Sequence, residues 1–334
     1  MAIKRGVYIA SLIGMLILLI VDTKTAVTGA FAGIELCLKS VIPSLFPFLI
    51  ISSLMGAAMG NNHYALAPLG KLCNMPSGCE NILFLGLLGG YPVGAKLVAQ
   101  QYEAGNLPEE NAHRLMGFCN NPGPAFIFGM LWDAFHNKYT LWALWGVQII
   151  SSLLVGIILP RQKTIGKAQS ENASQSIVET LSTCVRTMAN ICGWIVIFRV
   201  VIAYLQLYLF PFVPDTMQVI FAGILELTNG CHMLTQLQSV PLRFVLCSGM
   251  LSFGGICVTL QTASTAAKLG LGWYLPGKIL QTAFSIMIST LLQGIIFLDS
   301  VSATIPITLC FVVIGILYFT IFRKNSSNSV KYAV

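Results

Sequence analysis

Long apolar runs separated by short polar stretches occupy most of the chain. They fall at about 6–22, 27–59, 81–100, 113–132, 140–160, 181–208, 217–236, 242–266, 278–298 and 302–322. A helix needs about 20 consecutive apolar residues to cross a bilayer, so most of these runs are long enough for one crossing. The pattern predicts an all-α polytopic membrane protein with about 8–10 apolar helical segments.

The amino-acid composition supports the same class of protein. Hydrophobic residues make up 56% of the 334 residues and charged residues only 9%, whereas soluble domains carry about 25% charged residues. Such a chain cannot cover a globular surface with groups that water solvates. This excludes a soluble enzyme, a nucleic-acid binder and a disordered scaffold. The expected partner is the lipid bilayer, with no nucleic acid.

Basic residues gather at three places along the chain, each beside an apolar run. These places are Lys4–Arg5, Arg161–Lys167 and Arg323–Lys331. Positively charged residues stay on the cytoplasmic side of a membrane, so the net charge of +7 reports orientation and not a polyanionic partner. We expect a multi-pass protein with cytoplasmic N- and C-termini and a polar cytoplasmic linker over 161–180.

Two halves of similar size flank this linker and share a sequence pattern. Residues 84–98 align with 221–235 at a constant offset, and 118–129 resemble 252–262 in character. In each of these segments a polar or glycine-bearing stretch interrupts the apolar run. The pattern predicts an N-terminal transmembrane helix (1–26), a first repeat (27–160), the linker (161–180), a second repeat (181–298), and a C-terminal transmembrane helix with a cytoplasmic tail (299–334).

The charge pattern also limits how many segments cross the membrane. Each half has an odd number of apolar runs, yet the basic clusters place both ends of each half inside. We expect 113–132 and 242–266 to be re-entrant hairpins, because Asn120–Pro124 and Gly254–Gly255 interrupt their middles. An alternative splits 27–59 into two crossings near Lys39–Pro43.

The hairpin version makes specific predictions about topology. Positions 105 and 137 should lie outside, and positions 165 and 272 inside, with basic residues such as Lys278 at the cytoplasmic boundary. The second repeat would then be inverted relative to the first. Inverted repeats with broken helices near the bilayer midplane are typical of secondary transporters.

Glu226 is the sharpest single candidate for function. It lies about midway along the apolar run 217–236, where a charge costs at least ~2.5 kcal/mol on insertion scales. Thr228 and Asn229 follow it and extend the polar patch. Glu226 would bind a proton, a cation or a substrate; the alternative is a structural salt bridge with Lys96 or Arg199.

The other interrupted segments add candidate substrate-binding residues. Freed backbone groups and polar side chains at such breaks can hold an ion or a polar solute, although glycines also serve helix packing and asparagines serve as caps. The candidates are Gly89, Gly90, Tyr91 and Lys96 in the first break, Asn120 and Asn121 in the second, and Gly254, Gly255 and Gln261 in the last. Lys96 could instead extend its ammonium to the membrane interface.

Signatures of catalysis and metal binding are missing from the sequence. It contains no phosphate-binding loop, no H-E-x-x-H and no G-x-S-x-G, and its four histidines do not share ligand spacing. We therefore expect no catalytic residue, no metal site and no cofactor. The ten cysteines should pack as small apolar side chains, and Glu35 and Lys39 should form an ion pair one helical turn apart.

Several strings resemble a known family. FPFLI (46–50), GGYPVGAK (89–96), RLMGFCNNPGPAFIFG (114–129), ILELTNG (224–230) and SFGGICVTLQ (252–261) are similar to the YlbJ-type sporulation integral membrane proteins. These belong with the nucleoside-recognition, or Gate, domain proteins, which include parts of concentrative nucleoside transporters and of the FeoB ferrous-iron transporter. The resemblance spans residues 40–265. It implies a polytopic bacterial inner-membrane protein with two Gate-type repeats and a role in sporulation.

The leading functional hypothesis combines the resemblance with the broken segments. A small polar solute or ion would bind near the midplane, with Glu226 as the charged ligand or proton acceptor. The alternative is a non-transporting membrane component that assembles or signals during spore formation. A homo-oligomer or a larger channel with other membrane subunits stays open, and the word nucleoside describes ancestry and not a substrate.

Overall fold

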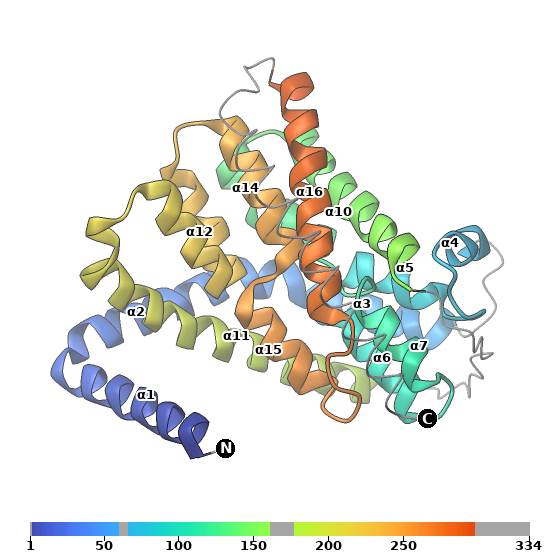
Figure 1. Cartoon of the computed structure of the whole chain (residues 1–334), viewed down its shortest axis with the longest axis horizontal. Coiled ribbons are helices and arrows are strands. Elements are labelled where there is room, and N and C mark those ends of the chain that lie inside the picture. The colour runs from blue at the N-terminus through green and yellow to red at the C-terminus, as the bar shows by residue number, and fades with distance from the viewer. Residues whose placement is uncertain (1, 60–65, 161–176, 298–334) are drawn as a thin grey trace.

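The computed structural model describes residues 2–59, 66–160 and 177–297, and every regular element in these ranges is helical (Figure 1). The prediction of an all-α polytopic membrane protein is confirmed. Five helices in the described part are long and apolar enough to cross a membrane: Thr23–Met55, Lys138–Ile158, Ile177–Tyr208, Val240–Thr265 and Tyr274–Gly294. The predicted helix and tail at 299–334 and most of the linker 161–180 lie outside the described residues.

The first half of the chain begins with long helices and continues with short, interrupted ones. Its elements are α1 (Ala2–Val21), α2 (Thr23–Leu36), a π-helical turn (Cys37–Val41), α3 (Ile42–Met59), α4 (Ala67–Leu72), α5 (Glu80–Gly89), α6 (Val93–Glu103), α7 (Glu109–Met116), α8 (Pro124–Met130), α9 (Trp132–Phe135) and α10 (Lys138–Ile158).

The second half repeats this alternation of long and interrupted helices. Its elements are α11 (Ile177–Tyr208), α12 (Asp215–Leu225), α13 (Leu227–Met233), α14 (Val240–Phe253), α15 (Gly255–Thr265) and α16 (Tyr274–Ile296), with 3-10 turns at Phe210–Phe212 and Leu234–Gln236.

The segment 27–59 stays helical throughout. The alternative of two crossings separated near Lys39–Pro43 is wrong, because the π-helical turn Cys37–Val41 joins α2 to α3 without a loop. The predicted ion pair is confirmed: Lys39 Nζ lies 2.6 Å from Glu35 Oε1, and both side chains are exposed.

Glycines bring α2 against the long helix α11. A Cβ atom on Gly33 would lie 2.9 Å from Val196 Cα, and one on Gly29 would lie 3.1 Å from Val200 Cα. Glycines four residues apart let two helix backbones approach closely inside a membrane. This contact fixes α11, whose residues 186–195 line the site described below, against the N-terminal helices.

The chain turns back on itself between α5 and α6. Helix α5 ends at Gly89, and Gly90 takes a φ of +77°, which favours glycine. A Cβ on Gly86 would lie 3.2 Å from Gly94 Cα, whereas eight residues of continuous helix would separate the two by about 12 Å. The segment 81–100 is therefore a helical hairpin.

A second hairpin forms between α12 and α13. Glu226 has extended backbone between the two helices (φ −148°, ψ 123°). A Cβ on Gly230 would contact Gly223 Cα and come 2.6 Å from Gly223 N, so the two helices pass each other at these glycines. In the alignment of 84–98 with 221–235 Glu226 stands opposite Gly89, so this break begins within one residue of the one after Gly89.

The prediction that 113–132 and 242–266 are re-entrant hairpins is therefore wrong. The hairpins lie instead at 81–100 and between α12 and α13. Val240–Thr265 forms a single 26-residue candidate span in which α14 and α15 follow one another across the molecule (Figure 1). Likewise, α7 packs on α6 and α16, whereas α8 packs on α3 and α10. Asn120–Pro124 and Gly254–Gly255 interrupt the helical hydrogen bonds without reversing the chain.

Two connecting segments meet at one end of the molecule. Lys268 Nζ lies 3.1 Å from Glu103 Oε2, and His113 Nε2 lies 2.7 Å from Leu269 O. The prediction that position 105 lies outside and position 272 inside is wrong, since both belong to this end. Acidic residues carry little topological information, and moving the hairpins adds one crossing between these positions, which makes the number of crossings even.

The connection between α9 and α10 lies at the other end of α16. Arg243 Nη1 donates a hydrogen bond of 3.0 Å to Ala134 O, and one cavity is lined by both Asn137 and Phe297. Helix α16 begins near α7 and ends here (Figure 1), which separates the two ends by about 34 Å.

We predict that cysteines at Ala104 and Ala267 are labelled from the same side of the membrane, and a cysteine at Lys138 from the opposite side. All three positions are exposed. The measurement is labelling of each variant in sealed vesicles with a membrane-impermeant thiol reagent, on a cysteine-depleted background. Labelling of Ala104→Cys and Ala267→Cys from opposite sides would contradict the fold.

Candidate functional site

All four interrupted segments meet at one small cavity of about 40 Å³. Each break contributes to its wall: Gly90 and Tyr91, Pro122 and Gly123, Glu226, Leu227 and Thr228, and Val258 and Gln261. Apolar side chains from α3, α8 and α11 complete the wall. The segments that the sequence singled out separately thus form one site.

The carboxylate of Glu226 lies in this wall and is almost fully buried, with 2% of the residue exposed. One oxygen accepts a hydrogen bond from Thr228 N at 2.9 Å, and the other accepts from Asn229 N and Asn229 Nδ2, both at 2.7 Å. Glu226 is the N-cap of α13, where free amides and the helix dipole favour a negative charge.

The salt bridge with Lys96 or Arg199, the alternative to a functional role for Glu226, does not form among the described residues. No Lys or Arg of the described ranges lies within ion-pair distance of its carboxylate. Arg199 instead donates to Gln206 Oε1 at 3.4 Å, and Lys96 is half-buried on α6 and lines neither this cavity nor the next one. Among the described residues, neutral groups of Thr228 and Asn229 therefore compensate the carboxylate.

A second, larger cavity adjoins the first. It has a volume of about 310 Å³ and is lined by Pro92, Arg186, Thr187, Asn190, Ile191, Gln261 and Thr265. Ile191 and Gln261 belong to both walls, and Arg186 and Asn190 are exposed. A polar vestibule therefore lies on one side of Gln261, and the Glu226 cavity lies on the other.

Gln261 is placed to interact with an occupant of either cavity. Only 4% of the residue is exposed, and its Nε2 donates a 3.2 Å hydrogen bond to Cys257 Sγ. A thiol is a weak acceptor, so this bond holds the amide loosely compared with a bond to a carbonyl oxygen. Gln261 lies within α15, and of the residues predicted in the last break it is the one that lines the cavity.

Asn120 and Asn121 do not line the cavity, contrary to their prediction as ligands. Asn120 Oδ1 accepts from Ala95 N at 3.3 Å, and its Nδ2 donates to Thr262 Oγ1 at 3.1 Å. Asn121 Nδ2 donates to Phe118 O at 2.7 Å and to Ser152 Oγ at 3.2 Å. Both side chains fasten the α7–α8 break to its neighbours.

The predicted glycines shape the site by close approach. A Cβ on Gly255 would lie 3.0 Å from Gly223 O, and one on Gly254 would lie 3.4 Å from Tyr91 Cζ. A Cβ on Gly89 would lie 2.9 Å from Ser52 Oγ of α3. Gly90 is the only one of the four predicted glycines that lines the cavity. Gly89, Gly254 and Gly255 instead allow the breaks to pack together.

Lys278 is the main residue that the sequence reasoning missed. Its side chain is fully buried on α16, and its Nζ donates to Tyr91 Oη at 3.1 Å, to Gln281 Oε1 at 2.8 Å and to Asn120 O. The prediction that Lys278 lies at the cytoplasmic boundary is wrong. Tyr91 lines the Glu226 cavity, so Lys278 lies directly behind that wall.

A polar stripe along α16 was the signal for this position. Lys278, Gln281, Ser285, Ser289 and Gln293 follow helical spacing in an apolar segment, and all are buried. Gln281 Nε2 donates to Asn121 Oδ1 at 2.8 Å, and Ser285 Oγ lies 2.7 Å from Ser248 Oγ of α14. A polar face on a membrane helix indicates an interior that is hydrogen-bonded.

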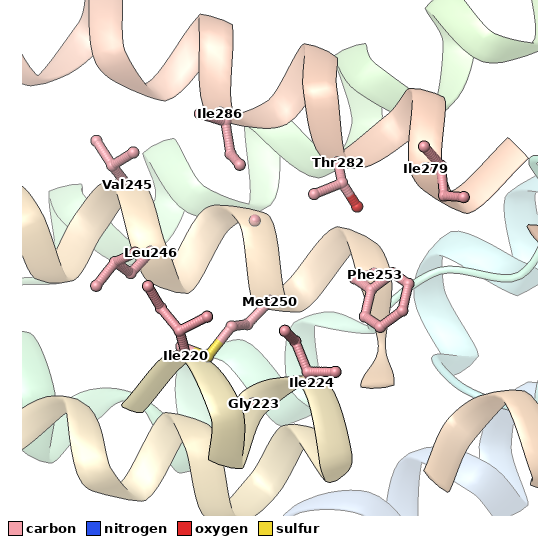
Figure 2. Close-up of a pocket in the computed structure, with 11 residues that line it drawn as sticks. Ile220, Gly223, Ile224, Val245, Leu246, Met250, Phe253, Ile279, Thr282 and Ile286 are labelled. Carbon is pink, nitrogen blue, oxygen red and sulfur yellow. The ribbon is translucent and has the colours of Figure 1, made fainter. Parts of the chain in front are cut away.

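A third cavity, of about 220 Å³, lies between α12, α14 and α16 (Figure 2). Its wall is apolar except for Thr282, and Ile220, Ile224 and Met250 point toward it from α12 and α14. Such a lining suits an acyl chain or an apolar side chain and offers too few hydrogen bonds for a polar solute. We do not assign it to the polar site.

The described residues contain no group of three or more His, Cys, Asp or Glu side chains that could hold a metal ion. Within these ranges the cavity offers a single carboxylate, hydroxyls and an amide as polar side chains. This set can bind a proton, a small cation or a hydrogen-bonding solute.

Comparison with curated proteins identifies a relative. The chain is 24% identical over 284 residues to the sporulation integral membrane protein YlbJ of Bacillus subtilis (strain 168), and the match covers 71% of this chain and 69% of the relative. This supports the resemblance to YlbJ-type proteins. No family model and no solved structure matches, so the wider relationship to nucleoside-recognition domains stays a prediction.

We predict that Glu226→Ala destabilises the protein more than Glu226→Gln. Alanine leaves the amides of Thr228 and Asn229 without their acceptor, at a cost of about 1–3 kcal/mol, whereas glutamine keeps one acceptor oxygen. Thermal unfolding of the purified variants measures the difference, with the exposed Glu110→Gln as control. Equal stability of Glu226→Ala and the control would show that the cap contributes nothing.

Proposed function

We propose that this multi-pass membrane protein is a secondary-transporter-like protein that moves a small polar solute or ion, with Glu226 as the charged ligand or proton acceptor. We further propose that it resides in a bacterial cytoplasmic membrane with cytoplasmic termini and acts in spore formation. The observation that carries the proposal is the convergence of four interrupted segments on one cavity walled by a buried carboxylate.

The size of the cavity limits its occupant. A volume of about 40 Å³ holds a few water molecules or one small ion, whereas ligand pockets for drug-sized molecules measure about 300–1,000 Å³. A nucleoside therefore does not fit beside Glu226 in this conformation. The adjoining vestibule of about 310 Å³ has the capacity for a larger solute.

The chemistry of the wall suits a cation, a proton or a hydrogen-bond donor. The Glu226 carboxylate has no described cationic partner and receives its hydrogen bonds from amides. A cation that enters the cavity would gain an attraction that no other group already satisfies. Interrupted helices that expose a carboxylate near the centre of a membrane protein are a recurring form of transporter binding site.

The vestibule supports a route to the site. Exposed Arg186 and Asn190 line it, and Gln261 and Ile191 separate it from the inner cavity. Movement of these two side chains would join the cavities. The pairing of a broad polar opening with a small inner site supports binding from one side of the membrane.

The alternative is a non-transporting membrane component that assembles or signals during spore formation. It is favoured by the N-cap geometry of Glu226, because a carboxylate that only caps α13 needs no ligand. The name of the Bacillus relative states sporulation and membrane integration and states no transport.

We predict that one class of solute raises the Tm of the purified protein and that the rise is reduced in Glu226→Gln. A ligand that binds only the folded state stabilises it by RT ln(1 + L/Kd), where L is the free ligand concentration, so the rise in Tm grows with ligand concentration. The screen compares alkali cations, divalent cations, amino acids, sugars and nucleosides, and Glu110→Gln serves as the control that retains the shift.

Two results would contradict the transporter proposal. The first is an absence of stabilisation by every class in the wild-type protein, which favours the assembly component. The second is a Glu226→Gln protein that retains the full solute-dependent shift together with full uptake or full sporulation, which removes Glu226 from the mechanism.

A further inference from the structure

We propose that Lys278 is a tethered cation: its ammonium occupies an oxygen-lined site for a monovalent cation and thereby holds the two interrupted segments of the first repeat together. The proposal goes beyond transport, since it concerns a different group on the far side of Tyr91 from the Glu226 cavity. It assigns a cation site that the lysine fills permanently.

The oxygen atoms around Lys278 match an ammonium. Three acceptors surround Nζ, namely Tyr91 Oη, Gln281 Oε1 and the backbone oxygen of Asn120, and an ammonium carries three N–H donors. Tyr91 gives its own hydrogen to Leu251 O at 3.0 Å, which leaves its oxygen free to accept. Each donor around Nζ therefore has an acceptor of the right kind.

The next neighbours hold these acceptors in place. Gln281 Nε2 donates to Asn121 Oδ1, which directs Oε1 of Gln281 toward Nζ. Asn121 is in turn held by Phe118 O and Ser152 Oγ. The site is thus built by residues from two breaks and from α10 and α16, and it does not depend on a flexible surface group.

Neutral groups alone balance the charge of the ammonium. Within the described ranges no carboxylate forms an ion pair with Lys278, and the residue is fully buried. The rings of Tyr91 and Tyr274 lie 5.0 and 5.9 Å from Nζ and add a cation–π contribution. Carbonyl, amide and hydroxyl oxygens around a desolvated cation are the donor set of monovalent metal sites at interrupted membrane helices.

The location explains why such a cation is useful. Asn120 O belongs to the α7–α8 break, where the backbone leaves the helical pattern, and Tyr91 belongs to the tip of the α5–α6 hairpin. A buried carbonyl without a donor is costly in lipid. Lys278 satisfies this carbonyl and joins both breaks to α16 with a single group.

The test replaces the lysine with residues that either open or fill the site. Lys278→Ala leaves a space in which a metal ion can bind, whereas Lys278→Met fills the space with a neutral chain of similar length. Each purified protein is heated in sodium, potassium, lithium or N-methylglucamine chloride at equal ionic strength. The exposed Lys268→Ala, whose lysine pairs with Glu103, is the matched control.

We expect Lys278→Ala to lose several degrees of Tm in N-methylglucamine and to regain much of that loss, in a saturable manner, with one of the alkali cations. Lys278→Met should lose stability without recovery, and the wild type and Lys268→Ala should show no such alkali-specific gain. Recovery separates a cation site from a lysine that only packs, because packing does not respond to the identity of the ion.

The proposal is overturned if Lys278→Ala shows no larger response to alkali cations than the wild type, or if it cannot be isolated in any of the four salts. The double variant Glu226→Gln/Lys278→Ala separates the two sites. Recovery that persists in it assigns the ion to the position of the ammonium, and recovery that disappears assigns the ion to the Glu226 cavity and contradicts the tethered cation. Neither result decides whether the protein transports a solute, because that is tested separately by the solute-dependent rise in Tm.

Discussion

Lipid provides no hydrogen bonds, and this constraint governs how the interrupted helices are arranged. Each break frees backbone groups that must find partners inside the protein. The breaks do so by meeting one another: Lys278 joins Asn120 O to Tyr91, and Tyr91 donates to Leu251 O at the end of α14. Four segments far apart in sequence thus become one polar centre within an apolar bundle.

This centre keeps its opposite charges apart. Neutral oxygens surround the ammonium of Lys278, and amides of α13 surround the carboxylate of Glu226. If the two groups paired directly, each would satisfy the other, and the carboxylate would have little attraction left for a ligand. With Lys278 held behind Tyr91, Glu226 stays available in the cavity wall, which is the arrangement that the proposed binding site requires.

The sequence was sufficient to locate the breaks and Glu226, because glycine, proline and an isolated carboxylate are conspicuous in apolar runs. It was not sufficient to decide which breaks reverse the chain. Glycine and proline show that a helix is interrupted, but direction depends on tertiary contacts such as Gly230 against Gly223. Lys278 was misread because basic residues near segment ends usually report orientation, and only the polar stripe along α16 distinguishes it.

The most direct test of the central polar contact is a double-mutant cycle between Tyr91→Phe and Lys278→Met, measured as free energy of unfolding in mixed micelles. Tyr91→Phe removes only the hydroxyl that joins the hairpin tip to the ammonium and to α14. The account predicts that the two substitutions are coupled by about 0.5–3 kcal/mol, as expected for groups in one hydrogen-bond network. Strict additivity would contradict it, because the two side chains would then not act through a common contact.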